Sequence, residues 1–102
     1  MVTVVISYTL DPYKLDAFEV YARRWLEIIP KCGGELVGYF MPHEGTNNIA
    51  LGLISFPSLA AYETYRALLK ADQAGAENFL FAALEKFIVA ERRTFMRQVA
   101  TE

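Results

Sequence analysis

Apolar residues fill nearly every position of two stretches, 35–41 and 48–56, with a polar loop between them. A strand with one face in solvent would alternate apolar and polar residues, whereas a continuous apolar run is typical of a strand buried on both faces. The loop is rich in turn-forming residues, among them Pro42, Gly45 and Asn47. The pattern therefore predicts a hairpin inside a sheet that is covered on both faces.

The segment before the hairpin predicts one strand and one helix. Residues 2–9 are mostly β-branched or aromatic, which favours a strand. The pair Asp11-Pro12 predicts the helix start, because aspartate caps a helix and proline suits its first turn. Gly33-Gly34 predicts the helix end. One apolar stripe runs along this helix, formed by Leu15, Phe18, Ala22, Trp25, Leu26 and Ile29.

Two helical segments and a final strand follow the hairpin. Ser58 predicts the start of a helix that carries Arg66 on its outer side. The side chains expected to face inward are Leu59, Tyr62, Tyr65, Leu68 and Leu69. Residues 72–75 interrupt the pattern, and residues 76–84 form a shorter helical piece. Residues 87–99 either extend that helix or form a strand; β-branched and aromatic residues favour a strand, placed centrally in the sheet.

The resulting order of elements is β-α-β-β-α-β, which is the split-βαβ arrangement of ferredoxin-like domains. Right-handed crossovers place both helices on one face of a four-stranded antiparallel sheet. A chain of 102 residues forms one domain, because smaller pieces would be too small to hold a core. The expected fold class is therefore α+β, with residues 1–102 forming a single ferredoxin-like domain.

The predicted helices leave the second face of the sheet uncovered. In the first strand, alternation sends Val4, Ile6 and Tyr8 to one face and Val5 to the other. The later strand divides in the same way, with one face formed by Ile49, Leu51 and Leu53 and the other by Ala50, Ile54 and Phe56. Monomers rarely expose an apolar patch of that size. We therefore expect a homodimer formed through the open sheet face, in keeping with a hydrophobic fraction of 54%.

Composition narrows the class of partner. The net charge is −2 and the ten basic residues are scattered, which argues against a nucleic-acid partner. The first residues lack the pattern of a signal peptide, and no apolar run approaches the ~20 residues that cross a bilayer. Cys32 is the single cysteine and has no partner for an internal disulfide. We expect a cytoplasmic protein without a membrane partner.

Several short motifs spread over the chain resemble the NIPSNAP family. They are Gly34 to Phe40, Glu44-Gly45 with Asn47-Asn48, Phe56 to Ala60, Tyr8-Thr9-Leu10, Ala71-Asp72 and Glu91-Arg92-Arg93. Two positions depart from the pattern, because the family more often has Phe-Trp at Tyr39-Phe40 and Asn at Arg92. The resemblance implies the dimeric α/β-barrel superfamily, in which two ferredoxin-like sheets close into a barrel with the helices outside.

What the resemblance implies about function is broad. Eukaryotic NIPSNAP members are mostly linked to mitochondria and to vesicle or signalling partners, and bacterial members are largely uncharacterised. The wider superfamily includes cofactor-free monooxygenases acting on polycyclic phenols, small-molecule isomerases and haem enzymes. A fold shared by such different proteins does not determine the function of one member.

Few residues offer chemistry by themselves. His43 is the only histidine and would serve as an acid-base group at a cavity mouth, but a solvent-exposed loop histidine is the reading we favour. Cys32 lies at a helix C-terminus, where the helix dipole disfavours a thiolate. A zinc site would need further histidine or cysteine ligands. We therefore expect no bound metal and no cofactor.

Aromatic and basic residues give the remaining candidates for a ligand site. Tyr8, Trp25 and Tyr39 would either line a cavity for a planar phenolic or quinonoid molecule or form plain core. Arg92 and Arg93 point to opposite faces of one strand, so at least one of them is expected to be buried. A buried guanidinium needs either an internal carboxylate, from Glu35 or Glu91, or an anionic ligand; we favour the internal pair.

Two classes of function follow from these residues. The first is a protein that binds or transforms a small aromatic or anionic molecule in a cavity of a homodimeric barrel, as a cofactor-independent oxygenase or isomerase would. Its tentative ligand-binding residues are Tyr8, Trp25, Tyr39, His43 and Arg92. The second is a non-catalytic protein-interaction module built on the same barrel. A pocket with Arg or Tyr polar tips favours the first class, and a solid core favours the second.

Overall fold

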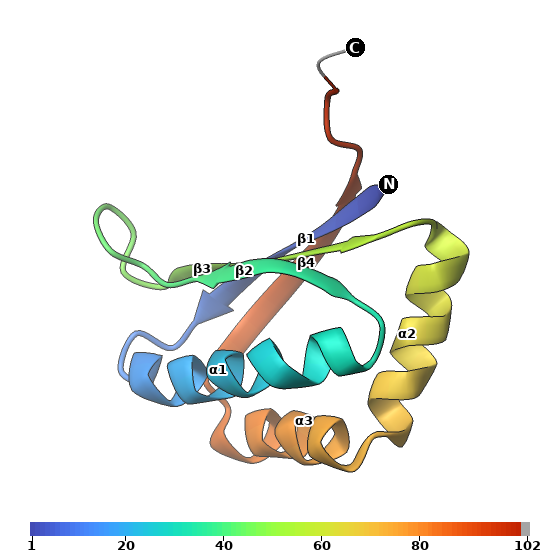
Figure 1. The fold of residues 1–102 in the computed structure, drawn as a ribbon. Helices are drawn as coiled ribbons and strands as arrows, with labels where there is room; N and C mark the ends of the chain where they lie inside the picture. Colours follow the sequence, from blue (N-terminus) through green and yellow to red (C-terminus); the bar gives the residue numbers. More distant parts are fainter. Residues whose placement is uncertain (101–102) are drawn as a thin grey trace.

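The computed structural model describes residues 1–100 of the chain. In chain order its elements are β1 (Val2–Leu10), α1 (Leu15–Lys31), β2 (Glu35–Phe40), β3 (Ile49–Phe56), α2 (Leu59–Ala71), α3 (Gln73–Glu85) and β4 (Ile88–Met96). The four strands form one antiparallel sheet in the order β2-β3-β1-β4. The helices all lie on one side of it (Figure 1). The predicted ferredoxin-like α+β fold is confirmed.

The pairing register divides the strand residues between the two faces of the sheet. Val4, Ile6 and Tyr8 of β1 are at most 2% exposed and face the helices. They join the large side chains of α1, above all Phe18 and Trp25, in one hydrophobic core. Alternation sends the intervening residues of each strand to the face without helices. The expected division of β1 and β3 between two faces is thus confirmed, with Ala50 and Ile54 on the helix side.

The start of α1 differs from the sequence prediction. Asp11 does not cap the helix; its carboxylate accepts a hydrogen bond of 2.9 Å from the backbone N–H of Tyr13 and closes a local turn. The backbone N–H of Asp11 bonds to the carbonyl of Phe87, which ties this residue to the strand end. The helix therefore begins at Leu15, after Lys14, which makes no side-chain cap. Aspartate before proline is common both at a helix N-cap and in a local turn, so the sequence alone did not distinguish these two structures.

The α2–α3 corner follows from two capping residues. Ser58 accepts a hydrogen bond of 3.1 Å from the Ala61 N–H, which confirms the predicted start of α2. Asp72 ends α2 and also caps α3 by accepting from the Gly75 N–H. The second helical piece is therefore longer than the predicted 76–84. Gly75 is required there, because an added Cβ would lie 2.6 Å from the Leu69 carbonyl oxygen.

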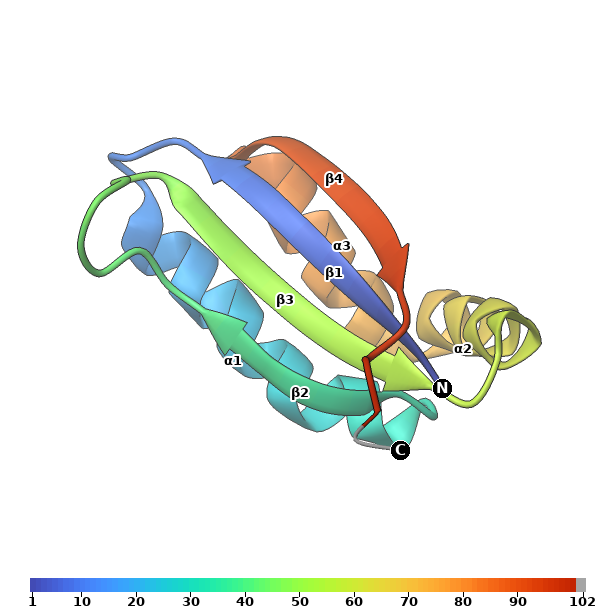
Figure 2. The ribbon, with the colours of Figure 1, turned by 90° about the horizontal axis from the view of Figure 1, so that it is seen from above.

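Three side chains of α2 lie elsewhere than predicted. Leu59 and Leu68 were expected to face inward, but they are 56% and 48% exposed. Arg66 was expected on the outer side, but it is half-buried and turns toward the interior. The helix touches the sheet mainly through Tyr65 and Leu69, which are buried. The predicted inward stripe was too wide, because α2 packs at the end of the sheet and covers little of it (Figure 2).

Strand β4 is an edge strand, not the central strand that the sequence predicted. In the observed order β1 lies between β3 and β4, so β4 has one neighbour only. Side chains of an edge strand keep contact with solvent on at least one side. Arg92 is accordingly exposed, and Arg93 is only half-buried.

The second face of the sheet carries no helix in the single chain (Figure 2). Val5 opposes Leu53 there, and Ser7 lies between Leu51 and Arg92. Phe40 of the outer strand β2 is 51% exposed. No helix within residues 1–100 is long and apolar enough to cross a membrane.

Gly52 provides a test of the packing on the helix face. A Cβ at this position would lie 2.8 Å from the ring of Tyr39, so Gly52→Ala must displace that ring. We expect the free energy of unfolding to fall by about 1–3 kcal/mol, as overpacked cores do. Denaturant unfolding measures this change. In a Tyr39→Leu background the same substitution should cost clearly less; an equal cost in both backgrounds would contradict the steric explanation.

Candidate functional site

A small cavity lies between the sheet and the helices. Its volume is about 20 Å³, which is room for about one water molecule. Its polar lining comes from five elements and consists of Tyr8, Tyr21, Trp25, Tyr39, Tyr65, Arg66 and Arg93. We call this set the tyrosine–arginine cavity. Apolar side chains, such as Ile54 and Phe79, complete the wall.

Tyr8 and Tyr39 form the part of the cavity that belongs to the sheet. Tyr39 pairs with Gly52 across β2 and β3, and the missing side chain of Gly52 lets the Tyr39 ring lie over β3. The two hydroxyl groups meet at 3.2 Å. Burial raises the pKa of both phenols well above their ordinary range. Both side chains are therefore neutral hydrogen-bonding groups.

Tyr21 and Tyr65 bring two further phenols to the cavity from α1 and α2. Burial raises the pKa of Tyr21 to about 12, although the neighbouring indole of Trp25 offsets part of this effect. Burial also raises the pKa of Tyr65, against the opposing charges of Arg93 and Arg66. Within residues 1–100, the Tyr65 hydroxyl makes no hydrogen bond. The raised pKa keeps it a protonated donor, and since it is not among the fully buried atoms that lack a partner, it retains some access to solvent.

Two guanidinium groups meet at the hydroxyl of Tyr62. Arg93 donates to Tyr62 Oη at 3.2 Å and forms an ion pair of 3.1 Å with Glu91. Arg66 donates to the same oxygen at 3.4 Å and has no carboxylate partner among residues 1–100. Burial alone would lower the pKa of Arg93, but Tyr62 and Glu91 outweigh it and raise the pKa. The cavity is thus bordered by two positive charges and one negative charge.

The structure brings together three of the five residues that the sequence suggested for a ligand site. Tyr8, Trp25 and Tyr39 all line the cavity. His43 is exposed on the loop before β3 and is not among the lining residues, in agreement with the favoured interpretation of a loop histidine. Arg92 lies on the opposite face of the sheet, beside Ser7 and Thr9.

Four lining residues were not identified from the sequence as site residues. Tyr21 follows Phe18 by three positions, and Arg66 follows Tyr62 by four, so helical spacing carried a signal for both. Tyr65 was counted as core, which it also is. For Arg93, the expected internal pair with Glu91 is confirmed. The two residues are two positions apart on one strand, so the pair does not cross between strands.

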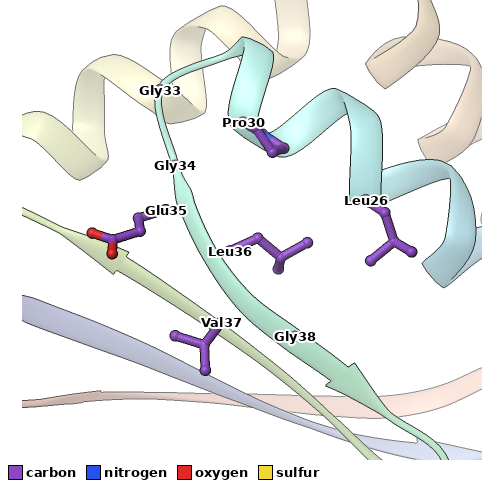
Figure 3. A pocket seen from close by; sticks show the side chains of 8 residues that line it. All are labelled: Leu26, Pro30, Gly33, Gly34, Glu35, Leu36, Val37 and Gly38. Atoms are coloured by element: carbon purple, nitrogen blue, oxygen red, sulfur yellow. The ribbon is translucent and has the colours of Figure 1, made fainter.

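A second, wider hollow lies outside the sheet, between the end of α1 and the edge strand β2 (Figure 3). Its volume is about 650 Å³, and the side chains of Leu26, Pro30 and Leu36 border it. Glu35 is the only ionisable residue in its lining. Cys32 lies close by in sequence, but it is buried, and burial raises the pKa of its thiol. This hollow has few groups that bind or react, so the tyrosine–arginine cavity is the better candidate.

Within residues 1–100, no three His, Cys, Asp or Glu side chains lie close enough together to hold a metal ion. The polar groups that line the cavity are neutral phenols, one indole and two guanidinium groups. Such groups bind oxygen atoms and stabilise negative charge on them.

The fold and the cavity define a ferredoxin-like α+β domain with a polar site between the sheet and the helices. The family model "NIPSNAP" matches residues 3–101, and the chain belongs to the NIPSNAP family. The resemblance seen in the sequence is thereby confirmed. Among proteins with curated descriptions, none matches the chain.

Solved structures share the whole fold. A protein from Agrobacterium tumefaciens is similar with a TM-score of 0.87 and 24% identity, over 99% of this chain and 96% of that one. An uncharacterised NIPSNAP domain protein from Burkholderia xenovorans is similar with a TM-score of 0.82 and 18% identity, over 99% of this chain and 97% of that one. A protein described as a putative antibiotic biosynthesis monooxygenase, from Nitrosomonas europaea, has a TM-score of 0.76 and 9% identity, over 98% of this chain and 100% of that one. Likeness at these identities concerns the fold alone.

The buried phenols should make the fold sensitive to alkali. Tyr8, Tyr21, Tyr39 and Tyr65 have a raised pKa when folded, so the unfolded chain loses protons first, from about pH 10 upward. Their contribution to stability is complete below about pH 10 and is lost as the pH rises further. We expect the free energy of unfolding to fall by up to about 1.4 kcal/mol per pH unit for each such tyrosine.

Denaturant unfolding between about pH 8 and pH 11 measures this slope. Tyr65→Phe should reduce the slope by one tyrosine's share, because phenylalanine does not titrate. Tyr13 is exposed and provides the control. Tyr13→Phe should leave unchanged the slope of the unfolding free energy with pH that the four buried phenols cause. A free energy that stays constant over this pH range would contradict the assignment of neutral, buried phenols.

Proposed function

We propose that this protein binds, or transforms, a small aromatic or anionic molecule at the tyrosine–arginine cavity. The observation that carries the proposal is the gathering of the Tyr65 hydroxyl, which makes no hydrogen bond within residues 1–100, and two guanidinium groups at one cavity. Phenylalanine would fill the same core without a hydroxyl group to satisfy. A hydrogen-bond donor that has no protein partner at a cavity is available to a ligand that supplies the acceptor.

The chemistry of the cavity supports an enzymatic version of this proposal. Neutral phenols donate hydrogen bonds to a ligand oxygen, and Arg66 or Arg93 stabilises negative charge that develops on it. These groups suit a cofactor-independent oxygenase or isomerase, whose substrate passes through a phenolate or enolate. The similar fold of a putative antibiotic biosynthesis monooxygenase is compatible with this role, but fold by itself does not assign function.

A ligand larger than water requires the cavity to open. Arg66 and Arg93 are the long, half-buried side chains in its lining, and rotation of such flexible side chains costs little compared with movement of the sheet. Opening at these two residues would place the ligand between the guanidinium groups and the phenols.

A screen of small phenols and aromatic acids by thermal unfolding tests the proposal. A ligand present at about one hundred times its Kd stabilises the fold by about 2.7 kcal/mol, which raises the Tm measurably. We expect Tyr65→Phe to weaken this stabilisation, because the ligand loses its free donor. The control is Tyr13→Phe, which makes the same change at a side chain that is 95% exposed. Absence of stabilisation by every phenol and acid at millimolar concentration would contradict the proposal.

A second function has its own support. The cavity has room for about one water molecule, so the core is close to solid, as expected for a fold that serves as the scaffold of a protein-interaction module. In that case the buried tyrosines serve packing and the mutual hydrogen bond of Tyr8 and Tyr39. The same screen separates the two functions, because a scaffold binds none of the compounds.

We further propose that the working form is a homodimer through the open sheet face, closing a dimeric α/β barrel. The support is the row of apolar side chains on this face, including Val5, Leu51 and Leu53, which the chain's own helices do not cover. Residues 97–100, which follow β4, also leave the sheet on this side (Figure 1). A second copy would bury the whole row at once.

Sedimentation at micromolar concentration tests the dimer. The unmodified chain is expected as a dimer, and Leu53→Arg as a monomer or an aggregate, because the new charge would be buried without a partner. Leu80→Arg makes the same change on α3, at a side chain that is 57% exposed on the helix side, and should stay dimeric. A clean monomer of the unmodified chain would exclude the proposal.

A further inference from the structure

We infer that the ligand of the tyrosine–arginine cavity carries a carboxylate group, and that Arg66 is the residue that binds it. The inference rests on the proposed function and narrows the aromatic or anionic class to aromatic monocarboxylates. It follows from three features of the lining within residues 1–100. One positive charge is not neutralised, most N–H donors of one guanidinium group have no acceptor, and a tyrosine hydroxyl beside that group makes no hydrogen bond.

Within residues 1–100, the charges at the cavity do not balance. Arg93 is paired with Glu91 at 3.1 Å, so these two charges offset each other. Arg66 has no carboxylate partner among residues 1–100. One positive charge therefore remains at a half-buried position that lines the cavity. A ligand with a single negative charge would neutralise it, whereas a phosphate dianion would leave a negative excess.

The two arginines differ in how many of their N–H donors form hydrogen bonds. Arg93 donates to Tyr62 through one terminal nitrogen and to Glu91 through the other. Among residues 1–100, the Arg66 side chain makes one hydrogen bond, to Tyr62 at the long distance of 3.4 Å. Most of its N–H donors therefore have no acceptor among these residues. A planar carboxylate can accept two parallel hydrogen bonds from such a guanidinium group.

Tyr65 supplies the third feature. It is the neighbour of Arg66 on α2, is 3% exposed, and lines the same cavity. Its hydroxyl makes no hydrogen bond within residues 1–100, so it is available to a carboxylate oxygen held by Arg66. Tyr8, Tyr21 and Trp25 line the same cavity behind these donors, so opening at Arg66 and Arg93 would bring an aromatic ring of the ligand against their rings.

Tyr62 is a positioning residue in this arrangement. Its oxygen accepts from both Arg66 and Arg93, and its ring packs edge-on against Phe56 and Phe95 at centroid distances of 5.3 and 5.0 Å. The ring contacts hold the hydroxyl in place, and the hydroxyl holds both guanidinium groups at the cavity. Because the bond from Arg66 is the longer one, Arg66 is the group that a ligand releases from Tyr62 most readily.

The test compares benzoate with benzamide, which has the same shape but no charge, and with phenol. Binding is followed by titration calorimetry and by the rise in Tm. We expect benzoate to bind at least about tenfold more tightly than benzamide. Arg66→Gln should remove this preference, and Arg66→Lys should restore it in part, since lysine keeps the charge but not the fork. Arg23→Gln, which removes a guanidinium that is 62% exposed on α1, should bind as the unmodified chain does.

The outcomes separate this inference from the proposed function. If benzamide or phenol binds as tightly as benzoate, the carboxylate inference is wrong and the proposed function stands. If Arg66→Gln keeps the preference for benzoate, Arg66 is not the binding residue. If no compound binds, both are overturned. The comparison of benzoate with benzamide on the unmodified chain decides the ligand class even if Arg66→Gln does not fold.

Discussion

A sheet of four strands has two faces, and this chain supplies helices for only one of them. On the covered face, α1 and α3 bury the even positions of β1 with Phe18 and Trp25, and this single core holds the domain together. On the other face, Leu51 and Leu53 remain without a covering layer. The burial of apolar area is the main force that favours folding, so a face left open is the part of the molecule that a second chain can stabilise most.

The covered face contains more polar groups than packing requires. Tyr8, Tyr21, Tyr39 and Tyr65 place four phenol oxygens in or beside the core, and Arg93 brings a guanidinium group to the same place. Each group costs free energy to remove from water unless a partner is found. Tyr8 and Tyr39 satisfy each other, but within residues 1–100 the Tyr65 hydroxyl has no hydrogen-bond partner and the Arg66 side chain has one, at 3.4 Å. Polar groups that lack protein partners at one connected place are groups that a ligand can satisfy.

Sequence reasoning predicted the fold better than the site, and the reason is physical. Hydrophobic runs and the Ser58 cap are local signals, and they gave the strands and the start of α2 correctly. Which of Arg92 and Arg93 faces the helices depends on strand register, because a shift of one residue exchanges the two faces. The register opposes Arg93 to Ile6 and is interrupted by an irregularity between Thr9 and Leu10, which no local pattern announces. For Arg66, the pattern of charge predicted solvent, while tertiary packing of Tyr62 and Tyr65 turned it inward.

The cavity and the proposed dimer face are separate in space but share their strands. Tyr8, Tyr39 and Arg93 alternate along β1, β2 and β4 with residues of the open face, such as Ser7, Phe40 and Arg92. The polar lining of the cavity described above is formed by residues of a single chain. A partner against the open face would instead restrain β4, which is bound on one edge only. Because Arg93 is carried by β4 and holds Tyr62 with Arg66, that restraint would fix the two guanidinium groups more firmly at the cavity.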